Sequence, residues 1–508
     1  MAMNKSSPAN SSLCYGCLFT GMFLLTFLSA DADQFKADNN SNLEQGASWL
    51  SGTVPSGNDF AIWNASVATS ANCTNTLGNA VTWGGIAITN PAAPVYISGN
   101  TTLTLSNGIN LASAAVNLTV DCGTLNLGRN QTWTVASGRL LTTGASGHSG
   151  AVNSPNNGNF IVTKNGAGTW TTSGNGDNGS SGIIVNQGLV NLNKSSSGGT
   201  HAVGGPGLTI NNGGTARITG TGGDQIYDGT SVTLASGGTF DLNGNNEGFA
   251  NLYGSGGTVD NTAAGTAATL ILGNGTSTFG GRLQNSGSGA TLGLFKSGTG
   301  TLTLSGANSY TGGTIISNGT VAFSSTANVS MPYIITTGGT LAVTAANATT
   351  SLPMSSLTLG GGAPALTFNL ASLHNFSVPI IGDSGNLSMN GNVAVNVMNF
   401  SQTGTTTLLQ YNGARSGSGS FVAGAVPAGA TIVDDTVNRR VQLNYISPSS
   451  PRIFIPTFST NEVVVAVATP QQYGAAGDGI TDDSAAFQAA MNAVYNSGGS
   501  GGGVVFVP

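Results

Sequence analysis

Three aspartates near the C-terminal end of the sequence, Asp478, Asp482 and Asp483, are the first residues that could do chemistry. Paired carboxylates can act as general acid and base on a glycosidic bond, or hold a hard cation such as Ca²⁺. Asp482 and Asp483 directly precede apolar residues at helical spacing, from Phe487 to Val494. Carboxylates in this position cap a helix and interact favourably with its dipole. We therefore predict that the three aspartates form a turn and a helix start.

The tetrapeptide 382–385, Gly-Asp-Ser-Gly, matches the nucleophile tract of chymotrypsin-like proteases in its four letters. A serine nucleophile needs a histidine base and an orienting carboxylate, and a triad is defined by their geometry and roles. The sequence contains three histidines, His148, His201 and His374, and none has the sequence context of that base. We predict that the chain is not a protease of this kind.

Two loops and five tryptophans are candidate ligand-binding features. Loops 174–182 and 241–247 carry acidic residues without a full set of alternating carboxylates, which predicts solvated turns rather than Ca²⁺ sites. The tryptophans could stack on sugar rings, but they lie in alternating strands, which favours a place in the core. They are Trp49, Trp63, Trp83, Trp133 and Trp170. The sequence thus assigns no catalytic, cofactor-binding or metal-binding residue.

The composition indicates the scaffold that carries these residues. Only 6% of the 508 residues are charged and 78 are glycine, whereas ordinary soluble domains have roughly 25% charged residues and about 7% glycine. Gly, Ser, Thr and Asn surround short runs of Leu, Val and Ile, which favours strands over helices. The chain has a net charge of −6 and 13 basic residues. This excludes the clustered basic surface that nucleic acid or anionic lipid requires.

An internal repeat is the strongest pattern in the sequence. The tract 164–174, Lys-Asn-Gly-Ala-Gly-Thr-Trp-Thr-Thr-Ser-Gly, returns at 296–306 as Lys-Ser-Gly-Thr-Gly-Thr-Leu-Thr-Leu-Ser-Gly. Each copy is followed by a second matching segment, at 182–190 and at 313–321. Shorter units, Gly-Thr-apolar-x-apolar or a near variant, recur between positions 168 and 339 at the short, nearly regular spacing of a solenoid repeat. A unit of this size cannot bury its own apolar face, so neighbouring units must stack.

We therefore predict an all-β fold, a parallel β-helix or solenoid. Strands such as 301–304 alternate Thr with Leu, so that one face is apolar, and Gly and Asn between the strands allow tight corners. A β-sandwich array or a β-propeller would need periods of about 40 residues or more. Residues 45–446 should form one continuous solenoid of about 18 turns, ~85 Å long at ~4.8 Å per turn.

Cys73 and Cys122 are the two cysteines that follow the N-terminal segment 1–32. With about 22 residues per turn, their separation corresponds to roughly two turns, or ~9.6 Å, whereas bridged Cα atoms lie within ~7 Å. We predict two buried thiols without a disulfide.

The tract 296–314, Lys-x-Gly-x-Gly-Thr-Leu-Thr-Leu-Ser-Gly-Ala-Asn-Ser-Tyr-Thr-Gly-Gly-Thr, resembles the autotransporter-associated β-strand repeat of bacterial surface and secreted passengers. The flanking stretches 49–59 and 407–443 also resemble such proteins, so the likeness extends loosely over residues 45–446. It implies a right-handed parallel β-helix outside the cell. An autotransporter should also end in a membrane β-barrel, and because no such strands are present, we expect no transmembrane barrel.

Residues 447–462 begin with Ser-Pro-Ser-Ser-Pro and are predicted to be a linker. Residues 463–508 resemble the opening of the pectate-lyase-like superfamily, which includes rhamnogalacturonase-type β-helices. The matching elements are Tyr473-Gly-Ala, Gly477-Asp-Gly, Thr481-Asp-Asp, an Ala-rich helix and the closing Gly-Val-Val-Phe-Val-Pro, while Ala476 stands where Lys is common. The resemblance implies one short α-helix, from about 483 to 495, that caps an incomplete domain. Catalytic groups, and any Ca²⁺, would belong to turns beyond Pro508.

Residues 1–32 are predicted to be a secretory signal peptide. Lys5 precedes an apolar run from Leu13 to Leu28, and Ala-Asp-Ala at 30–32 offers the small-x-small cleavage pattern. The alternative is an uncleaved membrane anchor, which this run would barely span. We expect a secreted or cell-surface bacterial protein with a β-helix from 33 to 446.

Two functions remain open. The first is a stalk joined to an enzyme, a polysaccharide lyase or glycoside hydrolase that degrades pectin- or rhamnogalacturonan-type polysaccharide. The second is a non-enzymatic adhesin or spike that binds glycans. The side chains that would decide between them are expected beyond Pro508, and the sequence leaves the oligomeric state open.

Overall fold

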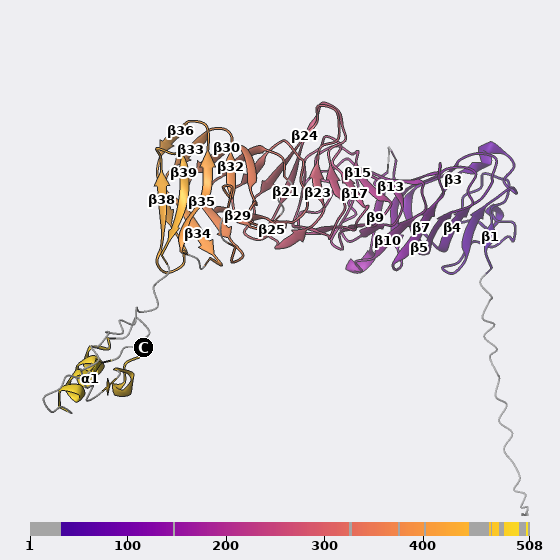
Figure 1. The fold of residues 1–508 in the computed structure, drawn as a ribbon. Helices are drawn as coiled ribbons and strands as arrows, with labels where there is room; N and C mark the ends of the chain where they lie inside the picture. Colours follow the sequence, from indigo (N-terminus) through magenta and orange to yellow (C-terminus); the bar gives the residue numbers. More distant parts are fainter. Residues whose placement is uncertain are drawn as a thin grey trace, which may run out of the picture.

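The computed structural model describes residues 32–145, 148–324, 328–373, 376–400, 403–446, 467–468, 470–476, 482–496 and 504–505. Its main body is a parallel β-solenoid of about 16 turns, drawn in Figure 1 as an elongated stack from the indigo N-terminal end to the orange C-terminal end. The predicted all-β solenoid is therefore confirmed. The predicted linker and nearly all of the predicted signal peptide lie outside the described residues.

The first column of strands runs along the whole solenoid, and within the column neighbouring strands pair in parallel. It consists of β1 (Gln34–Phe35), β2 (Phe60–Trp63), β4 (Val81–Ile88), β5 (Val95–Leu111), β7 (Gln131–Val135), β10 (Ile161–Asn165), β12 (Gly182–Val185), β14 (Leu208–Ile210), β16 (Ser231–Leu234), β19 (Asn251–Tyr253), β22 (Ser277–Phe279), β25 (Thr301–Leu304), β27 (Gly319–Phe323), β29 (Gly339–Thr344), β31 (Ala365–Asn369), β34 (Val393–Met398) and β37 (Phe421–Ala423). An isolated bridge, Gly254 to Phe279, joins its two halves.

A second column belongs to the N-terminal half and a third to the C-terminal half. The second consists of β3 (Thr74–Thr76), β6 (Leu118–Leu127), β8 (Leu140–Thr143), β9 (Ala151–Asn153), β11 (Thr169–Gly174), β13 (Gly188–Lys194), β15 (Gly214–Ile218), β17 (Thr239–Asp241), β20 (Thr258–Asp260) and β23 (Arg282–Gln284). The third consists of β18 (Glu247–Phe249), β21 (Ala267–Leu272), β24 (Thr291–Lys296), β26 (Thr314–Ile316), β28 (Met331–Ile335), β30 (Leu352–Gly360), β32 (Ile381–Asp383), β33 (Leu387–Asn390), β35 (Gly404–Tyr411), β36 (Arg415–Ser418), β38 (Ala430–Asp435) and β39 (Arg440–Tyr445). The 3₁₀ helices η1 (Gly46–Ser48), η2 (Ser70–Cys73) and η3 (Pro155–Asn157) lie in the connections.

The length of the turns varies, and this corrects the expected count of about 18 turns. Leu302 pairs with Val321, whereas Trp133 pairs with Lys164, a much longer step along the chain. The predicted period came from the shorter turns in the middle of the chain. Longer corners elsewhere consume more residues, so the solenoid has about 16 turns and a length of ~77 Å at ~4.8 Å per turn.

Alternation within the strands builds the core as predicted. In β25, Leu302 and Leu304 are buried, while Thr301 and Thr303, which alternate with them, face outward. Corners require glycine where they approach the turn below: Gly319 has a φ of +66°, and an added Cβ would collide with the carbonyl oxygens of Gly298 and Gly300. One continuous apolar cluster results, which reaches from Leu43 to Tyr445.

Both ends of the solenoid are covered. At the N-terminal end, Lys36 and Trp49 form an antiparallel bridge, and the Trp49 side chain is buried. At the C-terminal end β39 pairs antiparallel with β35, and β38 with β39. Asp434 of β38 binds Arg415 at 2.7 and 3.0 Å and accepts the backbone N–H of Phe421. These caps pair edges that would otherwise offer free hydrogen-bonding groups.

The short helix predicted near the C-terminus is confirmed as α1 (Ser484–Asn496), drawn in yellow in Figure 1. It packs against η4 (Pro470–Tyr473) and against β40 (Val467–Ala468) and β41 (Val504–Val505), which pair in parallel. Ala490 is buried, Phe487 is half-buried, and Met491 is 52% exposed. The predicted apolar face is therefore only partly covered.

Candidate functional site

The C-terminal aspartates serve the start of α1. The backbone carbonyl of Asp483 accepts the N–H of Phe487 at 3.0 Å, the first hydrogen bond of the helix. The carboxylate of Asp482 accepts the backbone N–H of Ser484 at 3.1 Å, and hydrogen bonds from Ser484 lower the pKa of this carboxyl. The predicted capping role is confirmed for the carboxylate of Asp482, whereas the carboxylate of Asp483 accepts the backbone N–H of Ala476 at 2.8 Å. Asp478 lies outside the described residues.

The protease-like tract 382–385 is built into the solenoid wall. Ser384 donates its hydroxyl to the carbonyl oxygen of Met354 at 2.9 Å, in the adjacent turn. Asp383 is buried, and its Oδ1 accepts the N–H of Gly385. His148 lies 3.1 Å from Asp121, His201 lies 3.0 Å from Asp177, and His374 lies outside the described residues. The structure thus brings no histidine among the described residues to Ser384.

The tryptophans and cysteines are core residues, as predicted. All five tryptophan side chains are buried, and Trp49 packs edge-on against Trp63 at 5.8 Å between ring centroids. Trp133 and Trp170 pack in the same way at 4.7 Å. Cys73 and Cys122 are buried and free.

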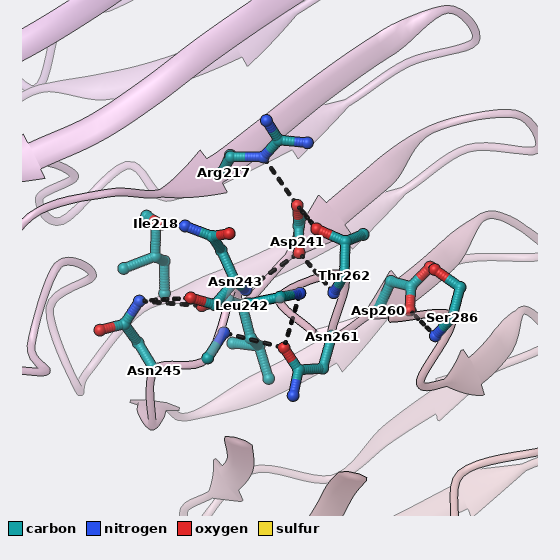
Figure 2. A network of polar contacts seen from close by, with 12 residues as sticks. Arg217, Ile218, Asp241, Leu242, Asn243, Asn245, Asp260, Asn261, Thr262 and Ser286 are labelled. Atoms are coloured by element: carbon teal, nitrogen blue, oxygen red, sulfur yellow. Dashed lines mark hydrogen bonds and ion pairs between the residues drawn. The ribbon is translucent and has the colours of Figure 1, made fainter. Parts of the chain in front are cut away.

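Figure 2 shows an extensive polar network on the wall, which centres on Asp241 at the end of β17. The Asp241 carboxylate binds Arg217 Nε at 2.7 Å and accepts the N–H of Asn243 at 2.9 Å. It also accepts the N–H of Thr262 at 3.2 Å and its hydroxyl at 2.7 Å. Asp241 is fully buried, so all of these donors compensate a charge that has lost its water.

One turn further, Asp260 repeats the arrangement. Its carboxylate accepts the N–H and the hydroxyl of Ser286, both at 2.8 Å, and the side-chain amide of Gln284 at 2.7 Å. Asp241 and Asp260 are register partners on neighbouring strands. A pair of facing carboxylates is what a glycosidase needs, but here both are buried and engaged by backbone groups. The two carboxylates therefore join neighbouring turns of the solenoid at a corner.

A second cluster surrounds His201, which is 6% exposed. Its Nδ1 lies 3.0 Å from Asp177 Oδ1 and its Nε2 lies 3.6 Å from Asp224 Oδ2. Burial raises the pKa of Asp224. The ring also packs edge-on against Tyr227. Loop 174–182, expected to be a solvated turn, is thus tied to two later turns through Asp177.

One acidic and one basic side chain, Glu247 and Lys194, are buried close to this cluster. Glu247 accepts the backbone N–H groups of Gln225 at 2.9 Å and Ile226 at 3.1 Å, and burial raises its pKa to about 8. Lys194 donates to the carbonyl oxygen of Gly150 at 2.8 Å, and burial lowers its pKa to about 7. Loop 241–247 is therefore anchored at both ends by buried carboxylates, which corrects the expectation of a solvated turn.

Two further buried lysines, Lys164 and Lys296, were not recognised as functional or structural residues from the sequence. Lys164 and Lys296 open the two repeat copies, and both are buried with their ammonium groups on main-chain carbonyl oxygens. The sequence feature that could have identified them is a lysine at a core-facing position of a strand in which polar and apolar residues alternate. Among the described residues, no group of three or more His, Cys, Asp or Glu is placed to hold a metal ion. No helix in the described part of the chain is long and apolar enough to cross a membrane.

One family model matches the chain. The passenger-associated-transport-repeat matches residues 294–323, which run from the end of β24 to the end of β27. The matched segment contains the tract that resembles the autotransporter-associated repeat. No curated protein and no solved structure matches the sequence. The chain is thus a parallel β-solenoid that carries a passenger-type repeat, and no comparison supports a pectate-lyase-like domain at residues 463–508.

Proposed function

We propose that residues 34–445 form a rigid stalk on the surface of a bacterial cell, or in a protein secreted from it. The observation that carries this proposal is the parallel pairing from β1 to β37 over about 16 turns, with both ends covered. The passenger-associated-transport-repeat at 294–323 supports an exported location. The buried groups of the network in Figure 2 are engaged within the wall, which suits a scaffold rather than a reaction centre.

A solenoid suits this role because every turn packs on its neighbours, so the stack can be lengthened without a new core. At ~4.8 Å per turn the described stack is ~77 Å long, which is comparable with the length of several small domains placed end to end. Its low charge, 6% of residues, leaves turn-to-turn hydrogen bonds and apolar packing as the main cohesion. The stalk would hold the segment after residue 446 away from the membrane.

Surface display is tested with an epitope inserted after Ile446. We expect added protease to remove the epitope from intact cells that express the full chain. A matched protein without residues 1–32 should keep its epitope, because it lacks the predicted export signal. Protection of the epitope in both strains would overturn the proposal.

The activity that we propose for the protein as a whole is degradation of a pectin- or rhamnogalacturonan-type polysaccharide. Its support is the resemblance of residues 463–508 to the opening of a pectate-lyase-like domain, together with α1, whose Met491 is 52% exposed as expected for a helix that caps a further turn. In this proposal the catalytic residues belong to the domain that begins at residue 463. The test is release of reducing ends or unsaturated products from these substrates by the purified full-length protein. Retention on the polysaccharide without release would instead identify an adhesin.

A further inference from the structure

An open groove lies on the corner between the first and second columns, and its volume is about 380 Å³. Small residues of consecutive turns line it, among them Ser236, Gly257 and Gly281. Thr258 and Arg282, the first residues of β20 and β23, line it as well. The groove therefore runs across several turns, along the long axis of the solenoid.

The glycines of the groove have a structural reason of their own. Gly257 has a φ of +81°, and a Cβ added to Gly281 would collide with the carbonyl oxygens of Gly256 and Gly257. Larger residues at these positions would keep the turns from packing as closely as they do. A ligand site is therefore indicated only if polar groups beside the glycines lack partners within the chain.

Arg282 lacks such a partner. Its side chain is exposed, and its guanidinium forms no ion pair or hydrogen bond with any residue that the structure describes. Arg217, on the same face of the second column, differs because its Nε binds Asp241 at 2.7 Å. Asp260, on the strand next to Arg282, is already engaged by Ser286. Arg282 thus offers a full set of guanidinium donors beside the groove.

Three threonine hydroxyl groups continue from Arg282 along the second column. Arg282 is the register partner of Thr258, Thr258 of Thr239, and Thr239 of Thr215. The three threonines alternate with buried residues and therefore face outward. None of their hydroxyl groups has a hydrogen-bond partner in the described part of the chain. The result is a row of free hydroxyl groups at ~4.8 Å spacing with a cation at one end.

Backbone N–H groups of the corner are further unused donors. Those of Gly256, Gly257 and Gly281 donate to no acceptor among the described residues. Successive free N–H groups in a turn form a concave site that favours anions. Arg282 and these N–H groups therefore create a local positive potential in a chain whose net charge is −6.

We propose that the groove binds an acidic glycan, a sugar chain that bears carboxylate groups and lies parallel to the long axis of the solenoid. A carboxylate accepts hydrogen bonds from the Arg282 guanidinium in a planar, bidentate pairing. Sugar hydroxyl groups then bind Thr258, Thr239 and Thr215, whose hydroxyl groups both donate and accept. The site belongs to the stalk, so the proposal does not depend on the activity proposed for the domain that begins at residue 463.

The balance of charged and uncharged groups favours a glycan over a nucleic acid. A phosphate backbone is densely charged and needs clustered cations. Here one arginine without a partner in the described chain lies beside several free hydroxyl groups. That ratio matches a ligand with many hydroxyl groups and few carboxylates, which is the composition of an acidic polysaccharide.

Protection of Arg282 from an arginine-specific dicarbonyl reagent tests the proposal in the full chain. A short oligogalacturonate at about four times its dissociation constant should slow modification of Arg282 about 5-fold, measured by mass spectrometry of its peptide. The carboxyl-reduced form of the same oligosaccharide should protect much less, because it lacks the charged acceptor. Arg129 is the internal control, since it is exposed on an earlier turn and should react equally with and without the ligand.

Two variants test the same contacts by calorimetric titration with the oligogalacturonate. Arg282→Met should weaken binding about 5-fold, as expected for the loss of an exposed ion pair. Thr258→Val should weaken it by a smaller factor, because only a neutral hydroxyl group is lost. Thr278→Val is the matched control, since Thr278 is exposed on β22 of the first column and does not line the groove. Far-ultraviolet circular dichroism should show that all three variants fold as the wild type does.

The possible outcomes separate this site from its alternatives. Protection by the reduced form as strong as by the acidic form, or protection by neither, would overturn the proposal. Equal protection by oligoglutamate would assign the groove to an acidic peptide instead. Unprotected Arg282 together with full release of reducing ends would overturn this site alone. Protection of Arg282 without any release would count against the proposed activity and leave this site in place.

Discussion

Lys296 Nζ donates a hydrogen bond to the carbonyl oxygen of Gly273, 2.7 Å away in the neighbouring turn. A second bond goes to the carbonyl oxygen of Gly298, just after the lysine. In the other repeat copy, Lys164 likewise binds the carbonyl oxygen of Gly166, at 2.7 Å, but its contact with a neighbouring turn is with Gln187 of the following turn, at 3.2 Å. The Lys-x-Gly spacing of the repeat therefore has a physical reason: the ammonium group satisfies carbonyl oxygens at a glycine-rich corner.

Replacement of Lys296 by Met should lower the free energy of unfolding by about 1–3 kcal/mol, because buried carbonyl oxygens lose their charged donor while the apolar stem is kept. The measurement is the denaturant midpoint. Arg282→Met is the control, since Arg282 is exposed, and it should change stability by less than about 0.5 kcal/mol. Equal effects of both variants would contradict the corner role.

The strands and the core could be predicted because both depend on local alternation. In Thr301–Leu304 the alternation of Thr and Leu is enough to predict which side chains point inward, because it does not depend on the rest of the fold. The number of turns was predicted less accurately than the strands, because it depends on how many residues each corner contains. The step from Trp133 to Lys164 is much longer than that from Leu302 to Val321.

The polar networks could not be predicted for a related reason. Glu247 binds the backbone of Gln225 and Ile226, 22 and 21 residues away, and Lys194 reaches Gly150, 44 residues away. Such partners follow only from the register, and a corner of unknown length shifts the register. The cap by Asp482 was predictable because it depends on an immediate neighbour, Ser484, whereas the bond from Ala476 to the Asp483 carboxylate depends on the path of the preceding loop.

Asp241 and Arg217 should contribute unequally to stability. Asp241→Ala leaves the partly buried N–H groups of Asn243 and Thr262 without their acceptor, which should cost about 2–3 kcal/mol. Arg217→Ala should cost about 1 kcal/mol or less, because the Arg217 side chain is 38% exposed. Thermal or urea unfolding of the two variants checks the order, and a larger cost for Arg217→Ala would show that the ion pair rather than the backbone contacts holds the corner.

The thiols of Cys73 and Cys122 should be unreactive in the folded chain and both titratable after unfolding without reductant. Both are buried, and burial raises the pKa of Cys122 to about 11, so little thiolate is present at neutral pH. Absorbance of a thiol-specific reagent gives the count. A linked pair of peptides in a non-reducing digest would contradict the free state.

Glu247→Gln should remove a dependence of stability on pH. Burial raises the pKa of Glu247 from its ordinary value near 4.5 to about 8, so the folded chain binds a proton that the unfolded chain releases between these values. Stability of the wild type should therefore fall as pH rises from about 4.5 to about 8, and an amide has no such proton to lose. The free energy of unfolding of Glu247→Gln relative to that of the wild type should be higher at pH 8 than at pH 5. With ~1.4 kcal/mol per pKa unit as the upper limit, this increase should be on the order of 2–4 kcal/mol.

The urea midpoint across this pH range gives the slope for wild type and for Glu247→Gln. Glu44→Gln is the control, because Glu44 is only half-buried and accepts the N–H of Gly78 at 2.8 Å. Its carboxylate keeps access to water, so its replacement by an amide should leave the fall in stability between about pH 4.5 and pH 8 in place. If Glu247→Gln kept the slope of the wild type while Glu44→Gln lost it, the buried carboxylate of Glu247 would not be the group that titrates.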